Sequence, residues 1–144
     1  MSLPPVAEIR PFDQTDEAQV IELWEECGLW RSWNDPHFDI ARKQAVEDGL
    51  FLVAEIDGAV VGTVMAGYDG HRGSINYVGV RPANRKRGIG RALMSAAEHR
   101  LLERGCPKIN LQVRMDNPEA VEFYRRLGYE TFAVVDMGKR LIAD

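Results

Sequence analysis

Apolar and polar residues follow the pattern of β-strands through the middle of the chain. Apolar and β-branched residues dominate positions 50–56 and 59–68, and the Asp57-Gly58 pair between them is typical of a two-residue hairpin turn. A further strand is expected over 74–80, after a glycine-rich turn. The pattern therefore predicts three neighbouring antiparallel strands.

Elsewhere the spacing of apolar residues lengthens to three or four, as in amphipathic helices. Helices are predicted to begin at Thr15, Asp39, Gly88 and Asn117 and to end at about Gly28, Asp48, Gly105 and Gly128. Thr15 is the expected N-cap of the first helix, and Asn117 caps a last helix that Pro118 begins. Additional strands are predicted over 8–12, 108–114, 129–135 and 137–142.

The resulting order is β-α-α-β-β-β-α-β-α-β-β, which predicts an α/β fold of the α+β type. A helix connects the fourth and fifth strands, so these two should be parallel within an otherwise antiparallel sheet. No repeat, low-complexity tract or linker divides the sequence. We therefore expect one domain over residues 1–144.

Composition narrows the class of protein. The 144 residues are 45% hydrophobic and 28% charged, which is typical of a folded globular domain. A net charge of −4 argues against a nucleic-acid partner, since phosphates demand a basic face. Cys27 and Cys106 are too few for a disulfide scaffold or a cysteine-based zinc site, and no leader or membrane span is recognisable. We expect a cytoplasmic protein with no metal.

The segment from Val78 to Leu93 carries the clearest chemistry. At a strand-to-helix junction the first helical amides are unpaired and bear the positive end of the dipole, so they suit an anion. Gly88 and Gly90 would let a diphosphate reach the backbone, and nearby cations would bind its oxygens: Arg81, Arg85, Lys86, Arg87 and Arg91. Two better-known phosphate motifs do not fit this segment. Leu93 occupies the position of the third glycine in a dinucleotide-binding fingerprint, and the Gly-Lys-Ser/Thr ending of a P-loop is absent from the sequence.

Three motifs together resemble the GNAT superfamily of acetyltransferases. They are Tyr77-Val78-Gly79-Val80-Arg81-Pro82, Arg85-x-x-Gly88-x-Gly90 and Asn117-x-x-Ala120-x-x-x-Tyr124-x-x-x-Gly128-Tyr129. The predicted element order matches that fold over nearly the whole chain. Residues 33–36, 67–73 and 104–108 are similar to the bacterial YpeA branch, related to ribosomal-protein alanine acetyltransferases.

This resemblance implies acetyl-CoA as cosubstrate and a role for each matched residue. Backbone groups of Val78 and Val80 would pair with the pantetheine arm, and the Val78 N–H would polarise the thioester carbonyl. The pyrophosphate would be bound at Arg85, Lys86, Arg87, Gly88, Gly90 and Arg91. Asn117 would contact the pantetheine, although an ordinary N-cap fits the same position. Tyr124 would protonate the leaving thiolate, although it could instead be a core aromatic.

The base that deprotonates the acceptor amine is not identified by the resemblance. Positions at which related enzymes carry glutamate appear here as Ser74 and Gln112. The remaining candidates are Glu55, Asp69, His71, Asp116, Asp35 and a water molecule held by Tyr77. Neither cysteine has a histidine or aspartate partner nearby in sequence, which favours direct transfer in a ternary complex over an acetyl-cysteine intermediate.

The acceptor pocket is expected between residues 30–38 and the turn at 69–73. Trp30, Trp33, His37 and Phe38 either pack under this loop or form a wall of the pocket. If Asp35 and Asp39 face the pocket, a cationic amine is favoured.

The first hypothesis is an N-acetyltransferase, monomeric or homodimeric, that acts on a peptide or protein N-terminus or on a small amine. The alternative is an acyl-CoA-binding sensor that has lost catalysis, for which the absent glutamates argue. Retention of Tyr124 argues against the sensor, because binding CoA requires no acid. A dinucleotide-binding domain is opposed by Leu93 and by the run of antiparallel strands.

Overall fold

The computed structural model describes residues 6–143. The chain divides into two compact units, with the boundary between Leu111 and Gln112, and each unit is described by itself. None of the helices in these described residues is long and apolar enough to cross a bilayer.

The first unit contains one mixed sheet, in which the described strands lie in chain order. Its strands are β1 Glu8–Pro11, β2 Phe51–Ile56, β3 Ala59–Tyr68, β4 Gly73–Val80 and β5 Ile109–Leu111. Strands β1 to β4 pair antiparallel, whereas β5 runs parallel to β4. The predicted fold class, with a parallel pair in a mostly antiparallel sheet, is confirmed.

The turn between β2 and β3 has the backbone conformation that its sequence predicts. Asp57 and Gly58 both have positive φ, at 49° and 82°, as a type I′ turn requires. Because the twist of this turn matches the twist of the flanking strands, it fixes the register that starts with Ile56 opposite Ala59.

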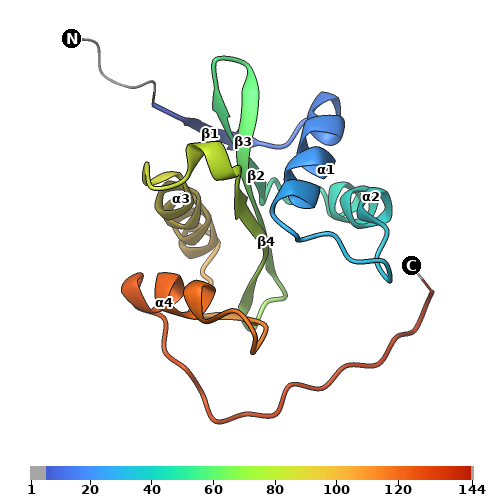
Figure 1. The fold of residues 1–144 in the computed structure, drawn as a ribbon. Helices are drawn as coiled ribbons and strands as arrows, with labels where there is room; N and C mark the ends of the chain where they lie inside the picture. The colour runs from blue at the N-terminus through green and yellow to red at the C-terminus, as the bar shows by residue number, and fades with distance from the viewer. Residues whose placement is uncertain (1–5, 144) are drawn as a thin grey trace. The chain divides into compact units, whose positions relative to one another are not determined.

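Two layers of helix cover the sheet. Helices α1 (Glu17–Glu26) and α2 (Pro36–Val46) lie on one face, and α3 (Ile89–Glu103) lies on the other (Figure 1). The sheet contributes β-branched and leucine side chains to the core between these layers. The fully buried large side chains include Trp24, Leu23, Ile40, Leu52, Val64, Leu93, Met94 and Leu101.

The first two helices begin at different residues from those predicted. Asp13, not Thr15, is the N-terminal cap: its carboxylate accepts from the Thr15 amide at 2.9 Å and opens a 3₁₀ turn before α1. Helix α2 begins at Pro36 because Asp35 accepts from the His37 amide, and proline fits the first turn. Asp39 consequently lies inside α2.

The second unit contains α4 (Pro118–Arg126), which starts as predicted with the Asn117 side chain accepting from the Ala120 amide at 3.2 Å. The strands predicted over 129–135 and 137–142 are wrong, because these residues form no strand. An apolar β-branched run becomes a strand only where a partner backbone pairs with it, and here Val134, Val135 and Met137 are exposed. The strand predicted over 108–114 is shortened to β5, whose pairing with β4 ends at Leu111.

Candidate active site

Strand β4 contains a bulge at its centre. Thr63 pairs with Gly79 and Met65 pairs with Asn76, so β4 has one residue more than β3 across this interval. Tyr77, within the interval, has a φ of +52°, a conformation that costs a non-glycine residue of the order of 1–3 kcal/mol. Surrounding contacts must therefore hold the bulge.

A buried hydrogen-bonded chain supplies those contacts. The Trp24 indole donates to Thr63 Oγ1 at 2.9 Å, and the Thr63 hydroxyl donates to the Tyr77 carbonyl at 2.7 Å. The rings of Trp24 and Tyr77 stack with their centroids 3.8 Å apart and 12° between their planes. Trp24 and Thr63 are fully buried, so water cannot replace these bonds.

Beyond the bulge, β4 extends past its parallel neighbour. Strand β5 pairs only with Gly73, Ser74 and Ile75, whereas β4 continues to Val80. The predicted pantetheine-binding residues Val78 and Val80 lie in this continuation. The Val80 carbonyl accepts from Arg85 Nε at 3.0 Å and from Cys27 Sγ at 3.3 Å.

The predicted pyrophosphate segment has the backbone geometry of an anion site. Lys86 and Gly88 have positive φ, at 65° and 78°. Gly88 is the N-cap of α3 and offers no side-chain cap, and the bond from the Ala92 amide to the Gly88 carbonyl is 3.0 Å long. The amides of 89–91 precede that first helical bond and so are available to an anion. Lys86, Arg87 and Arg91 are exposed, as is Arg85.

Arg81 is not available to bind an anion at this segment, contrary to the sequence-based expectation. Its guanidinium donates to the Val60 carbonyl at 2.8 Å and to the Gln19 carbonyl at 3.1 Å. It also pairs with the carboxylates of Glu22 and Glu26 on α1. Its charge is therefore balanced, and it joins α1 to the adjoining strands.

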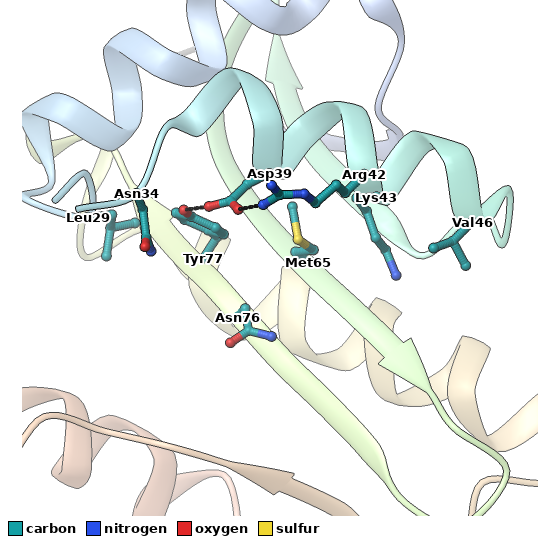
Figure 2. Close-up of a pocket in the computed structure, with 9 residues that line it drawn as sticks. All are labelled: Leu29, Asn34, Asp39, Arg42, Lys43, Val46, Met65, Asn76 and Tyr77. Carbon is teal, nitrogen blue, oxygen red and sulfur yellow. Dashed lines mark hydrogen bonds and ion pairs between the residues drawn. The ribbon is translucent and has the colours of Figure 1, made fainter. Parts of the chain in front are cut away.

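A pocket of about 550 Å³ lies between α2 and the β3–β4 face of the sheet (Figure 2). Residues of the α1–α2 connection, of α2 and of both strands line it: Leu29, Asn34, Asp39, Arg42, Lys43, Val46, Met65, Asn76 and Tyr77. Asn76 and Tyr77 are consecutive, and consecutive strand residues normally face opposite sides of a sheet. The bulge accounts for the presence of both in one pocket.

Asp39 and Tyr77 form the polar centre of this pocket. The Tyr77 hydroxyl donates to the Asp39 carboxylate, and Figure 2 shows the two side chains meeting between α2 and β4. Burial, with the Asp39 hydrogen bond, raises the pKa of Tyr77 well above its usual range, so the phenol stays protonated. Arg42 Nη1 lies 3.8 Å from Asp39 Oδ1.

This pocket overlaps only in part with the region in which the sequence predicts the acceptor pocket. The connection after α1 contributes Asn34, but neither the expected aromatic residues nor the turn at 69–73 line the pocket. Trp33 and Phe38 are each 52% exposed and Trp30 is 47% exposed. His37 is also exposed, with Nδ1 3.7 Å from Glu17. These four side chains are therefore exposed and do not line this pocket.

None of the side chains named from the sequence as candidate bases lines the pocket, whereas Tyr77, the residue expected to hold a water molecule, does. Glu55 accepts from Arg10 at 3.0 Å, and Asp35 caps α2. Asp69 accepts from the amides of Arg72 and His71, each at 2.7 Å, and these bonds lower the pKa of its carboxyl. His71 is exposed, and Asp116 in the second unit pairs with Arg114 at 3.3 Å.

Tyr124 lies on α4 in the second unit. Its ring contacts Phe123 and Tyr129 edge-on, with centroid distances of 5.1 and 5.8 Å. Burial raises the pKa of Tyr124 to about 12, which keeps its hydroxyl protonated at neutral pH. The expected capping by Asn117 is observed, and contact of that residue with pantetheine stays a prediction.

Local sequence patterns do not predict the Asp39–Tyr77 pair. The two residues lie 38 positions apart, and the sequence suggested only that Asp39 would favour a cationic amine if it faced the pocket. No pattern predicts the bulge that turns Tyr77 toward α2. Within the described residues, no group of three or more His, Cys, Asp or Glu side chains could hold a metal ion.

The sequence is similar to a known protein family and to a curated relative. The model of the Acetyltransferase (GNAT) family matches residues 12–129. Acetyltransferase YE1169 of Yersinia enterocolitica serotype O:8 / biotype 1B is 55% identical over 137 residues, which cover 95% of this chain and 97% of that protein.

Two solved structures illustrate the similarity of fold. Ard1 from Thermoplasma volcanium superposes with a TM-score of 0.80 at 26% identity, covering 89% of this chain and 85% of that one. The aminoglycoside N-acetyltransferase AAC(6')-Iy in complex with CoA has a TM-score of 0.76 at 18% identity, and each chain is 99% covered. The chain belongs to the GNAT family of acetyltransferases, whose acetyl donor is acetyl-CoA.

Proposed function

We propose that the protein transfers an acetyl group from acetyl-CoA directly to a primary amine in a ternary complex. The observation that carries this proposal is the bulged β4, because it joins three features in one stretch of chain. Its continuation past β5 supplies an edge for an extended ligand, its Tyr77 lines the pocket, and the segment after it has unpaired helical amides that suit an anion.

The donor would bind along β4 and at the start of α3. Pantetheine would pair with the backbone at Val78 and Val80 as an added strand does. Arg85 would release the Val80 carbonyl, which it now binds, and turn toward the pyrophosphate. The remaining contacts to the pyrophosphate would come from Lys86, Arg87, Gly88, Gly90 and Arg91.

The reaction uses groups of this chain, the two substrates and water as the proton acceptor. The acceptor ammonium first gives one proton to water. The neutral amine nitrogen then attacks the thioester carbonyl carbon, so that a C–N bond forms and the C–S bond breaks, and the extra proton left on the nitrogen also passes to water. The Val78 N–H would stabilise the oxyanion, and Tyr124 would give its proton to the leaving thiolate. The raised pKa of Tyr124 supports this last role, since the acid must enter the reaction protonated.

A peptide or protein N-terminus, or a small amine, is the proposed acceptor. We also infer that the two compact units act as one catalytic domain, since the family model runs across their boundary from residue 12 to residue 129. A cytoplasmic location is supported by the two cysteines, both free in the described chain.

Ligand-induced stabilisation tests the donor site. Acetyl-CoA at about 100 times its Kd should stabilise the protein by about 2.7 kcal/mol, whereas NAD should not. Arg87→Ala should weaken acetyl-CoA binding roughly tenfold, because an exposed cation would be lost from the anion site. Arg81→Met removes a neighbouring charge as a control. It should lower the melting temperature of the free protein yet preserve the shift with acetyl-CoA, and equal shifts with NAD and acetyl-CoA would remove the assignment.

Release of free thiol from acetyl-CoA, followed with a panel of amines and short peptides, tests catalysis. Tyr124→Phe should lower kcat at least about tenfold while the affinity for acetyl-CoA stays within about twofold. Tyr129→Phe, a change of the same kind in the same unit, should leave kcat unchanged. A Tyr124→Phe variant with normal turnover contradicts the role of general acid. The absence of thiol release with every acceptor would favour the acyl-CoA sensor instead.

A further inference from the structure

We propose that Asp39, held in place by the Tyr77 hydroxyl, binds the ammonium group of the acceptor, and that the pocket selects alkyl amines carrying one positive charge. This inference rests on the proposed function, because it assigns the pocket of Figure 2 to the acceptor. It adds the residue that recognises the acceptor and the chemical class of that acceptor.

The charges that line the pocket lead to this assignment. Of the nine residues drawn around it in Figure 2, Asp39 is the one carboxylate. Lys43 is already balanced, since its Nζ lies 2.8 Å from Asp48 Oδ2 and also donates to the Ala66 carbonyl. Arg42 lies on the same helix as Asp39, one turn away, and its side chain is 50% exposed. An ammonium entering the pocket therefore meets a complementary charge only at Asp39.

Asp39 is held more firmly than a surface carboxylate. Its side chain is 20% exposed, and the next residue, Ile40, is fully buried and anchors this turn of α2. Tyr77 is fixed by its stacking on Trp24 and by the bond from Thr63 to its carbonyl. Tyr77 donates to Asp39 Oδ2, and Arg42 Nη1 lies 3.8 Å from Asp39 Oδ1, so an ammonium would have to share this carboxylate with Arg42 through its remaining lone pairs. Partial burial strengthens such an ion pair relative to one in water.

The rest of the lining sets the chemistry beyond the ammonium group. Leu29, Val46 and Met65 provide apolar surface, which suits a hydrocarbon segment attached to the amine. Asn34 and Asn76 provide neutral donors and acceptors. A second ammonium on the same molecule would find no second carboxylate in the lining. A monoamine is thus favoured over a polyamine.

The Asp39–Tyr77 pair lies next to the residue proposed to bind the thioester. Tyr77 immediately precedes Val78, whose backbone N–H is proposed to polarise the thioester carbonyl. An ammonium bound beside Tyr77 would be held next to the strand along which the pantetheine is proposed to run. Asp39 would therefore hold this nitrogen beside the thioester, and the nitrogen attacks after the ammonium has given one proton to water.

Binding of n-hexylamine and 1-hexanol to the full-length protein, followed by NMR chemical shifts, tests the proposal without requiring turnover. The two probes have similar size, but the amine, with a pKa near 10.4, is protonated at pH 7. The side-chain amides of Asn34 and Asn76 report binding in the pocket itself. We expect the wild-type protein to bind the amine about tenfold or more tightly than the alcohol, the ratio typical of one charged hydrogen bond.

Two aspartate variants separate recognition from general charge effects. Asp39→Asn keeps the shape and the bond from Tyr77, and it should bring the affinities for the two probes within about twofold of each other. Asp35→Asn removes the same charge from the N-cap of that helix, yet asparagine caps equally well, so the preference for the amine should persist. 1,6-Diaminohexane should bind less tightly than hexylamine.

Particular results would overturn the proposal. Equal binding of amine and alcohol by the wild-type protein, or the absence of binding at Asn34 and Asn76, removes the ammonium site. A preference for the amine that persists in Asp39→Asn assigns it to another group. Thiol release reports separately on the proposed function, so an active enzyme without an amine-selective pocket would refute this inference alone.

Discussion

Thr63 tests whether the bulge in β4 depends on the hydrogen-bonded chain below it. Thr63→Val keeps the shape of the side chain but removes a hydroxyl that both accepts from Trp24 and donates to Tyr77. The indole N–H and the Tyr77 carbonyl would then lose their partner in a fully buried site. Each unsatisfied group costs about 1–3 kcal/mol, so we expect a total of about 2–6 kcal/mol.

This loss is large compared with the stability of a small domain, which is about 5–15 kcal/mol. Urea unfolding at pH 7 should therefore show a midpoint about 1–3 M lower, with an unchanged slope of about 2 kcal/mol per M. The hydrogen bonds from Trp24 through Thr63 also fix Tyr77. The Thr63→Val variant should therefore acetylate amines more slowly under conditions in which it remains folded.

Thr63→Ser provides the matched control. It keeps the hydroxyl and loses one methyl group, for an expected cost of about 1 kcal/mol. Valine is the better volume match, so packing alone would make the serine variant the less stable one. The reasoning is refuted if the valine variant is as stable as the wild-type protein, or more stable than the serine variant.

Two further predictions concern stability elsewhere in the first unit. Asp16 is buried, and its hydrogen bond from Arg10 lowers the pKa of its carboxyl. That stabilisation is complete above the unfolded-state pKa of about 3.9 and is lost as the pH falls through the lower folded-state pKa. Asp16→Asn should therefore destabilise by about 2 kcal/mol at pH 7 in urea unfolding, and by clearly less at pH 3. An equal loss of unfolding free energy at pH 7 and at pH 3 would contradict this linkage between protonation and stability. Gly62→Ala should cost about 1–3 kcal/mol, because its new methyl would lie 2.9 Å from Leu93 Cδ1 and 3.1 Å from the Gly79 carbonyl oxygen. Gly138→Ala meets nothing within 4 Å and should shift the thermal midpoint by less than about 2 °C; similar shifts for both variants would show that crowding is not the cause.

Local chemistry made much of the fold predictable. The Asp57-Gly58 turn, the Asn117-Pro118 helix start and the change of period at α3 depend on residues close together in sequence, and all three are confirmed. Thr15 was a less reliable guide, because Asp13 two residues earlier is an equally good cap and takes that role.

Features that depend on distant residues were not predictable from local patterns. Arg81 looks like one cation among several after β4, but carboxylates on α1, more than 50 residues earlier, take up its charge. Tyr77 has a left-handed backbone because Thr63 and Trp24 hold it, and neither is a neighbour in sequence. The apolar run over 129–135 has the composition of a strand, but composition does not supply a partner backbone.

The order of the strands also has a consequence for how the first unit folds. Strands β2, β3 and β4 are joined by short turns, so their pairing closes small loops and should form early, on the microsecond timescale of hairpins. Pairing of β4 with β5 must wait for the whole α3 crossover and closes a much longer loop. Destabilising changes in the β2–β3 hairpin should therefore slow refolding, whereas changes in β5 should mainly speed unfolding.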